Sequence, residues 1–450
     1  MSKMTTDSEY LDLAAKLMEN ARAGGADAAE AVMVESRSLS LAYRNGKREQ
    51  LNRAEAIDLG LRVFRGHRQA IVSTSDLSPS SLGELVDRAL SMARVVPEDP
   101  HCGLAEPDQL IAGANGIDIC EDGEPPVDTL LERAVEAEDA ARAISGVTNS
   151  EGAESSWGMT TKTVVSTNGL AKRYSRSWNS LAVSVLAGSG TEMERDYDFS
   201  TSVYAGDMRS PAEIGRSAGE RAVRRLNPRK VDSGNFSVVY DRRASRSLLG
   251  HLSMAVNGSS VTRGTTFLKD KLNERVFPDA ITVVDDPLRK RGLRSRPFDA
   301  EGIAPRSMKI VDAGVLRSWV LDLRSARKLG LETTGHASRG IASTPSPSTT
   351  NLYLEPGDRS LEELLADIKE GFYATELIGF GINGITGDYS RGASGYWIED
   401  GKITYPVSEV TIAGNLLDMF ANLSAANDLE FRYGTDAPSL RVDGMTVAGK

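Results

Sequence analysis

Residues 29–46 read AEAVMVESRSLSLAYRNG, the clearest structural signal in the chain. Apolar and polar residues alternate through Ala29–Ser36 and Leu39–Tyr43, which is typical of half-buried strands. Asn45-Gly46 is the dipeptide that tight hairpin turns prefer. This pattern predicts a meander of antiparallel strands, which continues with Ala56–Phe64, a turn at Gly66-His67, and Gln69–Thr74.

Helices are predicted on both sides of this meander. Apolar residues recur at helical spacing from Glu9 to Arg22, and Gly24-Gly25 ends that helix. Ser81 and Glu84 have the spacing of a capping box, which predicts a second helix from there to about Val95. Residues 1–96 are therefore predicted to form an N-terminal α/β domain with an antiparallel sheet and flanking helices.

The next region, residues 97–126, contains five prolines and little periodicity, which predicts a linker or wrapping loop. A helix at Val127–Ile144 and strand-like segments up to Ala205 then repeat the first layout. Ser78-Pro79 and Ser210-Pro211 open the last helix of each unit, so the repeat is either an internal duplication or a helix-start pattern that arose twice. We assign residues 127–228 to a central α/β domain.

Residues 229–450 contain longer β-prone runs with Gly and Asn turns, which predicts a β-rich C-terminal domain. The fold class expected for the whole chain is α+β (mixed). Helices are predicted in this region at Arg243–Val256, Leu361–Glu370 and Asn415–Ala425.

Composition restricts the function. The 450 residues carry a formal net charge of −10, so direct nucleic-acid binding is disfavoured, and the basic run from Arg221 to Lys230 is interpreted as a solvated helix end. The only two cysteines, Cys102 and Cys120, cannot form a disulfide framework or a four-cysteine zinc site. No stretch approaches 18 uninterrupted apolar residues, so we expect a cytoplasmic protein without membrane association.

Motifs of common catalytic sites are missing. There is no phosphate-binding G-x-x-x-x-G-K-[ST] loop and no G-x-S-x-G nucleophile elbow. Gly379, Gly381 and Gly384 have a dinucleotide-type spacing but lack the strand-to-helix context, so a turn or close backbone packing is the better interpretation. No two of the four histidines lie within six residues of each other, so the paired histidine ligands of a typical hydrolytic zinc site are missing. One weaker alternative is a metal-free hydrolase that uses Asp285, Asp286 or Asp388.

Four strings carry a resemblance to a known family. Residues 298–302 read FDAEG, residues 325–330 read SARKLG, residues 386–393 read TGDYSRGA and residues 405–416 read YPVSEVTIAGNL. Together they resemble the TldD/PmbA family, known as modulators of DNA gyrase and as peptidases. The match is dense from about Asp232 to the C-terminus and looser upstream. It implies a dimer of TldD-type and TldE/PmbA-type subunits that encloses a cavity in which unstructured peptides are cut.

In that family the TldD type carries H-E-x-x-x-H, two zinc-binding histidines beside a glutamate base. The corresponding positions here are Arg246, Ser247 and His251. Arginine has no lone pair for zinc, and serine cannot replace the carboxylate base. Shifting the motif so that His251 comes first places Leu252 and Val256 at the other two positions, which is no better. The chain therefore resembles the TldE/PmbA-type subunit: no cofactor is expected in it, zinc is expected in a TldD-type partner, and His251 is interpreted as a packing or hydrogen-bonding residue.

The remaining candidate for peptide binding is a glycine-rich segment. Its small residues allow close backbone approach, which suits an extended peptide added along a strand edge. The other explanation is a tight turn buried at the subunit contact. The six residues are Thr386, Gly387, Asp388, Tyr389, Ser390 and Arg391.

The sequence thus predicts the non-catalytic subunit of a cytosolic TldD/TldE-type metallopeptidase that degrades unstructured peptides. The alternative is a homodimeric modulator that binds a gyrase-linked or toxin–antitoxin partner without proteolysis.

Overall fold

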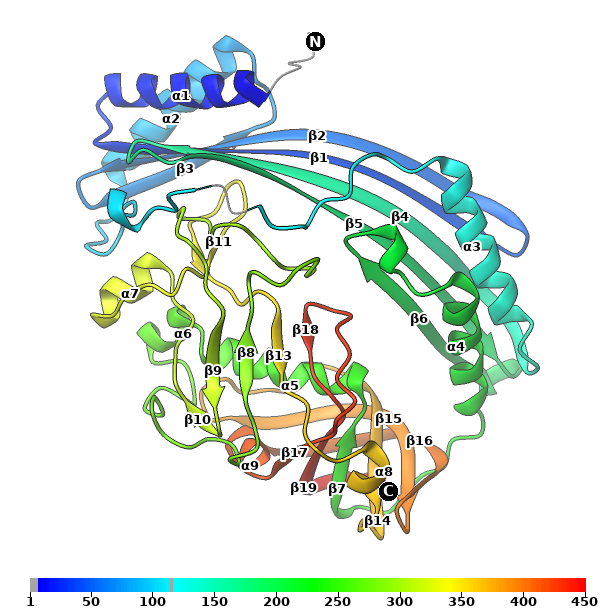
Figure 1. The fold of residues 1–450 in the computed structure, drawn as a ribbon. Helices are drawn as coiled ribbons and strands as arrows, with labels where there is room; N and C mark the ends of the chain where they lie inside the picture. Colours follow the sequence, from blue (N-terminus) through cyan, green and yellow to red (C-terminus); the bar gives the residue numbers. More distant parts are fainter. Residues whose placement is uncertain (1–6, 114–115) are drawn as a thin grey trace.

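One six-stranded antiparallel sheet forms an arch over the rest of the molecule (Figure 1). The computed structural model describes residues 7–113 and 116–450; residues 1–6 of the predicted N-terminal domain and residues 114–115 of the predicted loop lie outside this part. The strand order is β3-β2-β1-β4-β5-β6. Their bounds are β1 (Ala28–Arg44), β2 (Lys47–Arg65), β3 (Arg68–Thr74), β4 (Val147–Ser166), β5 (Ala171–Ala187) and β6 (Glu194–Ser202).

The predicted meander is confirmed, although its strands are longer than the sequence pattern indicates. The segments 29–36 and 39–43 belong to the single strand β1, which pairs with β2 across the turn at Asn45-Gly46. Both turn residues have positive φ, 49° and 81°, as a type I′ hairpin requires.

The sheet also joins the first two predicted domains. Strand β1 pairs with β4 from Glu30 opposite Ser166 to Tyr43 opposite Ala153. Each half has the order helix, three strands, helix, in agreement with the recurrence noted in the sequence. The division into domains at residues 96, 126 and 228 stays a prediction.

Two helix pairs cover the outer face of the arch, one pair at each end (Figure 1). Ala29, Ala31 and Met33 of β1 pack in the core under the first pair, and Leu39 and Leu41 pack under the second. The first pair is α1 (Asp7–Ala23) and α2 (Pro79–Val95), and the second is α3 (Val127–Arg142) and α4 (Pro211–Arg224).

The predicted capping box at Ser81 and Glu84 is wrong. Helix α2 begins at Pro79, two residues earlier, with Ser78 as N-cap. Proline at the first helical position favours this start because its φ is already helical. The Ser81 hydroxyl instead donates a hydrogen bond to Asp76 (2.6 Å).

The C-terminal region contains two further sheets. A five-stranded sheet has the order β10-β9-β8-β13-β18, and a six-stranded one has the order β16-β15-β14-β7-β19-β17 and is closed by a β16–β19 pairing; we call the latter the barrel. The first consists of β8 (Val283–Asp285), β9 (Met308–Asp312), β10 (Val315–Leu316), β13 (Leu352–Leu354) and β18 (Thr435–Asp436). The barrel consists of β7 (Gly234–Tyr240), β14 (Glu370–Ile378), β15 (Asp388–Glu399), β16 (Lys402–Asn415), β17 (Leu423–Ala425) and β19 (Leu440–Ala448). A short ribbon joins β11 (Ala337–Ser338) to β12 (Ser346–Pro347).

Two helices of this region are shorter than predicted. Helix α8 (Leu361–Leu365) ends before Glu370, because Glu370 begins the barrel strand β14. Helix α9 (Leu416–Ala421) ends before Leu423–Ala425, which pairs with β19. In both cases strand pairing overrides local helix propensity. The predicted helix at Arg243–Val256 corresponds to α5 (Arg242–Ala255), which is followed by α6 (Gly258–Arg263) and later by α7 (Leu323–Leu329).

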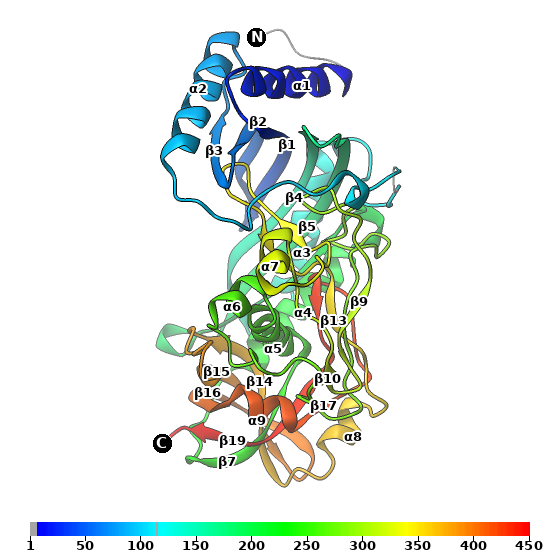
Figure 2. The same cartoon turned by 90° about the vertical axis from the view of Figure 1, so that its left-hand side faces the viewer.

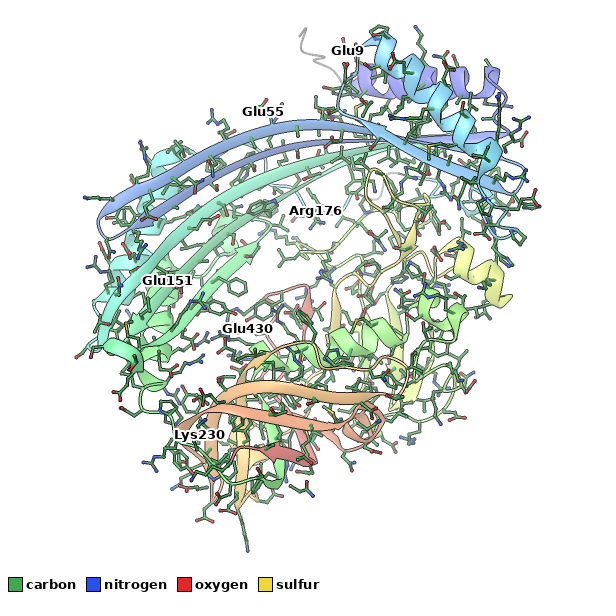
Figure 3. The ribbon with its side chains drawn as sticks, turned by 180° about the vertical axis from the view of Figure 1, so that it is seen from behind. Glu9, Glu55, Glu151, Arg176, Lys230 and Glu430 are labelled. Carbon is green, nitrogen blue, oxygen red and sulfur yellow. The ribbon has the colours of Figure 1, made fainter. Side chains whose placement is uncertain are left out.

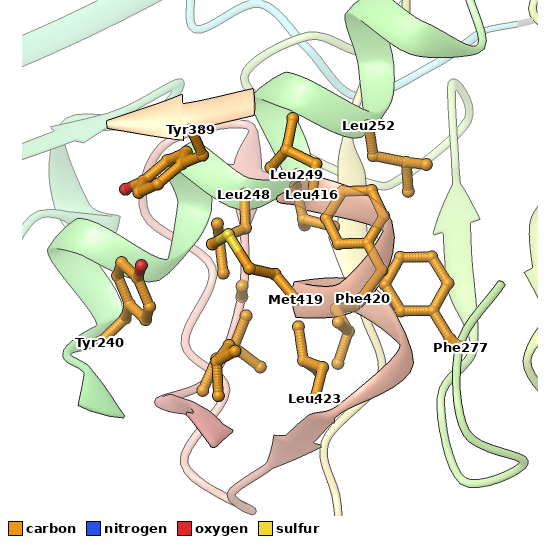
Figure 4. Close-up of a cluster of buried hydrophobic side chains, with 14 of the residues drawn as sticks. Tyr240, Leu248, Leu249, Leu252, Phe277, Tyr389, Leu416, Met419, Phe420 and Leu423 are labelled. Carbon is orange, nitrogen blue, oxygen red and sulfur yellow. The ribbon is translucent and has the colours of Figure 1, made fainter. Parts of the chain in front are cut away.

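Helix α5 lies between the arch and the barrel strands in both views (Figures 1 and 2). Its buried side packs into the largest hydrophobic core, together with α9 and the barrel (Figure 4). The observed mixture of helices and mainly antiparallel sheets, with parallel pairs only at β7–β14 and β13–β18 among the described strands, confirms the α+β class. No helix in the described ranges is long and apolar enough to cross a membrane.

Candidate functional site

Helix α5 carries the three positions of the degenerate metal motif. Its N-terminus is fixed by the Asp241 carboxylate, which accepts hydrogen bonds from the backbone N–H groups of Arg243 and Ala244 (2.8 and 3.0 Å). Leu248 and Leu252 are fully buried in the core below the helix. This packing sets the rotation of the helix and therefore the direction of the motif side chains.

Arg246 and Ser247 are occupied by contacts unrelated to a metal. The Arg246 guanidinium lies over the Tyr433 ring, 4.4 Å from its centroid, and its Nε donates to the Arg243 carbonyl (3.3 Å). The Ser247 hydroxyl donates to the Ala244 carbonyl (2.7 Å). Ser247 therefore satisfies its hydroxyl within the helix, and Arg246 adds a cation to this face.

His251 is buried, with 7% of its surface exposed. Neither ring nitrogen has a hydrogen-bond partner in the described part of the chain. The ring packs edge-on against Tyr389, with 5.9 Å between centroids. Burial, with a smaller contribution from the charge of Arg391, lowers the pKa of His251 to about 4, so the imidazole is neutral at pH 7.

This donor set does not fit a zinc ion. Zinc sites in proteins use several imidazole, thiolate or carboxylate ligands, and the three motif positions of α5 offer one imidazole, one hydroxyl and one guanidinium. Within residues 7–113 and 116–450, no group of three or more His, Cys, Asp or Glu side chains is arranged to hold a metal ion.

The predicted peptide-binding segment begins in the connection between β14 and β15 and continues into β15. The side chains of Thr386, Asp388 and Ser390 are exposed. Gly387 and Tyr389 are buried, and Arg391 is half-buried. Because successive residues of a strand point to opposite faces, the six residues do not form one continuous surface.

The structure leaves no free strand edge along Asp388–Ser390 to which an extended peptide could be added. On one side β15 pairs with β16 through Asp388, Tyr389 and Ser390. On the other side the backbone N–H of Ser390 donates to the Gly381 carbonyl (2.7 Å), and that of Asn383 donates to the Asp388 carbonyl (2.8 Å). Both edges are thus occupied. Gly381 is needed here because a side chain would collide with the Ser390 backbone, which supports close packing as the meaning of the glycine pattern.

The structure brings together residues from two separate sequence strings. His251 comes from α5, whereas Tyr389 and Arg391 come from the TGDYSRGA string on β15. The Arg391 Nε atom is also buried without a hydrogen-bond partner among the described residues. The cluster therefore consists of a neutral imidazole, a phenol ring and a guanidinium. It includes His251, the last position of the degenerate metal motif.

The sequence interpretation missed an aromatic cluster between α5 and the arch. Tyr197 and Phe199 of β6 stack on each other, and Phe199 also contacts Tyr433. The guanidinium of Arg243 lies over the Tyr197 ring, 4.5 Å from its centroid. The spacing Tyr-Asp-Phe in residues 197–199 could have indicated this cluster, since aromatic residues two apart on a strand lie on the same face of the sheet.

The FDAEG string builds a turn. The Asp299 carboxylate accepts backbone hydrogen bonds from Glu301, Ile303 and Ala337 (2.8, 3.0 and 3.0 Å). Glu301 accepts one from Leu323 (2.9 Å). Burial raises the pKa of both carboxyl groups. These acids hold loops together.

The carboxylates of the metal-free hydrolase alternative do not form a site. Asp285 is fully buried, and its oxygens accept from His336 Nε2 (2.9 Å) and from the Thr350 backbone N–H (2.7 Å) and hydroxyl (2.5 Å). Asp388 lies in another sheet and accepts a hydrogen bond from the Thr386 hydroxyl (2.6 Å). The first group is structural, and the second is part of a surface turn.

Comparison with known proteins gives a consistent result over the whole chain. Models of the PmbA/TldA metallopeptidases match here in three parts: domain 1 at residues 29–93, the central domain at 120–226 and the C-terminal domain at 233–449. Metalloprotease PmbA of Escherichia coli O157:H7 is 35% identical over 452 residues, covering 100% of this chain and 98% of that protein. A PmbA homolog of Haemophilus influenzae is 34% identical, covering 96% and 94%.

Solved structures agree with these sequence matches. A protein from Bacteroides thetaiotaomicron that is described as a modulator of DNA gyrase superposes with a TM-score of 0.91 at 29% identity, over 99% of this chain and 100% of that one. TldE from Thermococcus kodakarensis has a TM-score of 0.83 at 21% identity, over 97% and 100%, and shows the shared fold.

Proposed function

Since this chain belongs to the TldD/PmbA family of peptidase-related proteins, we propose that it is the metal-free subunit of a two-subunit metallopeptidase acting on unstructured peptides. In this proposal the partner is a TldD-type subunit that carries H-E-x-x-x-H and holds the zinc. The complex works in the cytoplasm, and this chain contributes walls of the peptide chamber but no catalytic group.

The proposal is supported mainly by the contacts that the three motif side chains of α5 make. Arg246 stacks on Tyr433, Ser247 bonds within the helix, and His251 packs against Tyr389. A subunit with these side chains cannot polarise a peptide carbonyl through a metal or activate a water molecule with a carboxylate at this position. Its relatives are nevertheless named metalloproteases, which is understandable if the activity belongs to a complex.

The part assigned to this chain is binding and positioning of the peptide. The exposed polar groups of Thr386, Asp388 and Ser390 are candidate peptide contacts, as is the arginine–aromatic cluster at Arg243 and Arg246. The first group offers hydrogen bonds and the second offers flat aromatic and guanidinium surfaces. Neither demands a particular substrate side chain, which suits substrates of varied sequence.

The test compares this chain alone, a TldD-type subunit alone and the mixture, each with zinc and an unstructured peptide. Activity that appears or rises strongly only in the mixture, with stoichiometric zinc in the partner, is the expected result. Stoichiometric zinc and peptide cleavage by this chain alone would overturn the proposal.

A second candidate function is a homodimeric modulator without proteolysis, and it is favoured by the description of one structural relative as a modulator of DNA gyrase. It predicts stable self-association and no change in peptidase activity when the chain is added to a TldD-type subunit. Light scattering together with the mixing assay separates the two functions.

A further inference from the structure

An unusually basic segment lies on the inner side of the molecule. Residues 289–296 read RKRGLRSR, five basic residues in eight, in a chain whose net charge is −10. The segment is part of the connection between β8 and β9 and reaches the arch. The Arg291 guanidinium pairs with Asp118 and Asp207 (3.0 Å each), and Arg176 of β5 donates to the Leu293 carbonyl. Arg176 and Glu430 lie between the arch and the barrel (Figure 3).

This segment forms one wall of a pocket of about 240 Å³. The other walls are the end of β6 with the following loop, and residues 430–436. Hydroxyl groups of Ser200, Thr201 and Ser202 lie along one side. The charged residues that line the pocket are Arg209, Arg289, Lys290, Arg291 and Arg432 against Asp207, Glu430 and Asp436.

Most of the lining charges already have partners. Arg209 and Arg432 pair with Asp198 (2.7 and 3.2 Å), which lies outside the pocket lining. Lys290 lies 3.8 Å from Asp118.

The acids are engaged as well. Glu430 pairs with Arg242 (2.8 Å). The Asp436 carboxylate accepts the backbone N–H groups of Arg432, Tyr433 and Gly434 (2.9, 2.8 and 3.1 Å).

Arg289 is the exception. Its guanidinium lies over the Phe431 ring, 3.3 Å from the centroid. In the part of the chain that the structure describes it forms no ion pair with a carboxylate, although its charge acts on the Asp436 carboxyl and favours the ionised form of that group. Stacking fixes a guanidinium without using its N–H donors, so these donors remain available in a defined plane.

We propose that this pocket binds a carboxylate group of a peptide, with Arg289 as its main contact. A planar guanidinium matches a carboxylate in bidentate geometry, and the β6 hydroxyls can bond the adjacent peptide groups. The carboxylate comes from the peptide C-terminus or from an acidic side chain. A nucleic-acid backbone is disfavoured because the pocket is small and the chain is acidic overall. The inference rests on the proposed function only in taking a peptide as the ligand.

The test measures peptide binding to this chain alone by fluorescence anisotropy. Three labelled peptides of the same unstructured sequence are compared: one with a free C-terminal carboxylate, one amidated, and one amidated with a glutamate side chain near its end. We expect the free or the acidic peptide to bind about 10-fold more tightly than the neutral one. Whichever binds identifies the source of the carboxylate.

Arg289→Gln should abolish this preference, and Arg289→Lys, which keeps the charge but not the bidentate geometry, should retain part of it. Arg48→Gln on the exposed part of β2 is the matched control, since it makes the same change in net charge away from the pocket. An equal preference in Arg289→Gln and wild type, equal binding of all three peptides, or tighter binding of single-stranded DNA that depends on Arg289 would overturn the inference.

The two proposals fail separately. If the mixture with a TldD-type subunit cuts peptides but Arg289→Gln leaves the carboxylate preference unchanged, only the pocket assignment is wrong. If this chain prefers acidic peptides through Arg289 but never supports cleavage, only the proposed function is wrong.

Discussion

His251 should make the folded state sensitive to acid, and replacing it with phenylalanine should remove that sensitivity. In the folded chain burial lowers the pKa of His251 from 6.5 to about 4. Above pH 6.5 the imidazole is neutral in both the folded and unfolded states, so stability there is independent of its titration. Below pH 6.5 the unfolded state takes up a proton and the folded state does not until about pH 4, so stability falls as the pH is lowered through this window.

The size of the effect follows from these two pKa values. Each pH unit between them corresponds to about 1.4 kcal/mol. Acidification from pH 7.5 to 5.0 should therefore remove about 2 kcal/mol through this one residue, allowing for partial titration near each limit.

The assay is urea unfolding followed by tryptophan fluorescence at pH 7.5 and pH 5.0. Wild type and His251→Phe share every other titrating group, so the difference between their pH dependences isolates His251. His67→Gln on the exposed β2–β3 turn controls for the loss of one imidazole. A pH dependence in His251→Phe equal to that of wild type would refute the reasoning, because a buried neutral imidazole must contribute to it.

Three further predictions concern packing, a buried network and metal. Gly395→Ala should destabilise the folded chain by about 2 kcal/mol or more, because the added Cβ would collide with the Tyr373 carbonyl. Gly250→Ala on α5 should instead stabilise it by about 1 kcal/mol, because the added Cβ meets nothing within 4 Å and alanine favours a helix more than glycine does. Thermal melting of both variants checks this. Asp285→Ala should lower the free energy of unfolding by about 3 kcal/mol or more, since it leaves His336 Nε2 and a Thr350 N–H unpaired in the core, and a loss below 1 kcal/mol in urea unfolding would contradict this. Treatment of the purified chain with EDTA should leave its melting temperature unchanged; a drop of several degrees that zinc reverses would reveal a structural metal.

The sequence was most informative where structure is determined locally. The hairpin at Asn45-Gly46 could be predicted because few residues tolerate positive φ. The fold class followed from the alternation of apolar residues. Of the two starts noted for the second helix, Ser78-Pro79 was confirmed and the capping box at Ser81 was wrong, because a proline at the first helical position already has a helical φ.

The candidate sites depend on contacts between distant segments, which periodicity cannot reveal. His251 meets Tyr389 because α5 and β15 pack on the same core, and the two residues lie in separate strings of the sequence. The pocket around Arg289 is assembled from three segments that are remote in the chain. The sequence therefore indicated which strings mattered, while their partners could be found only in three dimensions.

The sheet shared by the two N-terminal units has a consequence for biosynthesis. The inner edge of β1 is covered by β4, which begins at Val147, whereas β1 itself ends at Arg44. About 100 residues must be translated between them, which takes about 5–20 s at ~5–20 residues per second. During that interval a nascent chain presents a long unpaired edge on β1. Because both units have the same layout, neighbouring nascent chains could cover that edge with each other's β1, so polysomes are where domain-swapped or aggregated forms of this protein would arise.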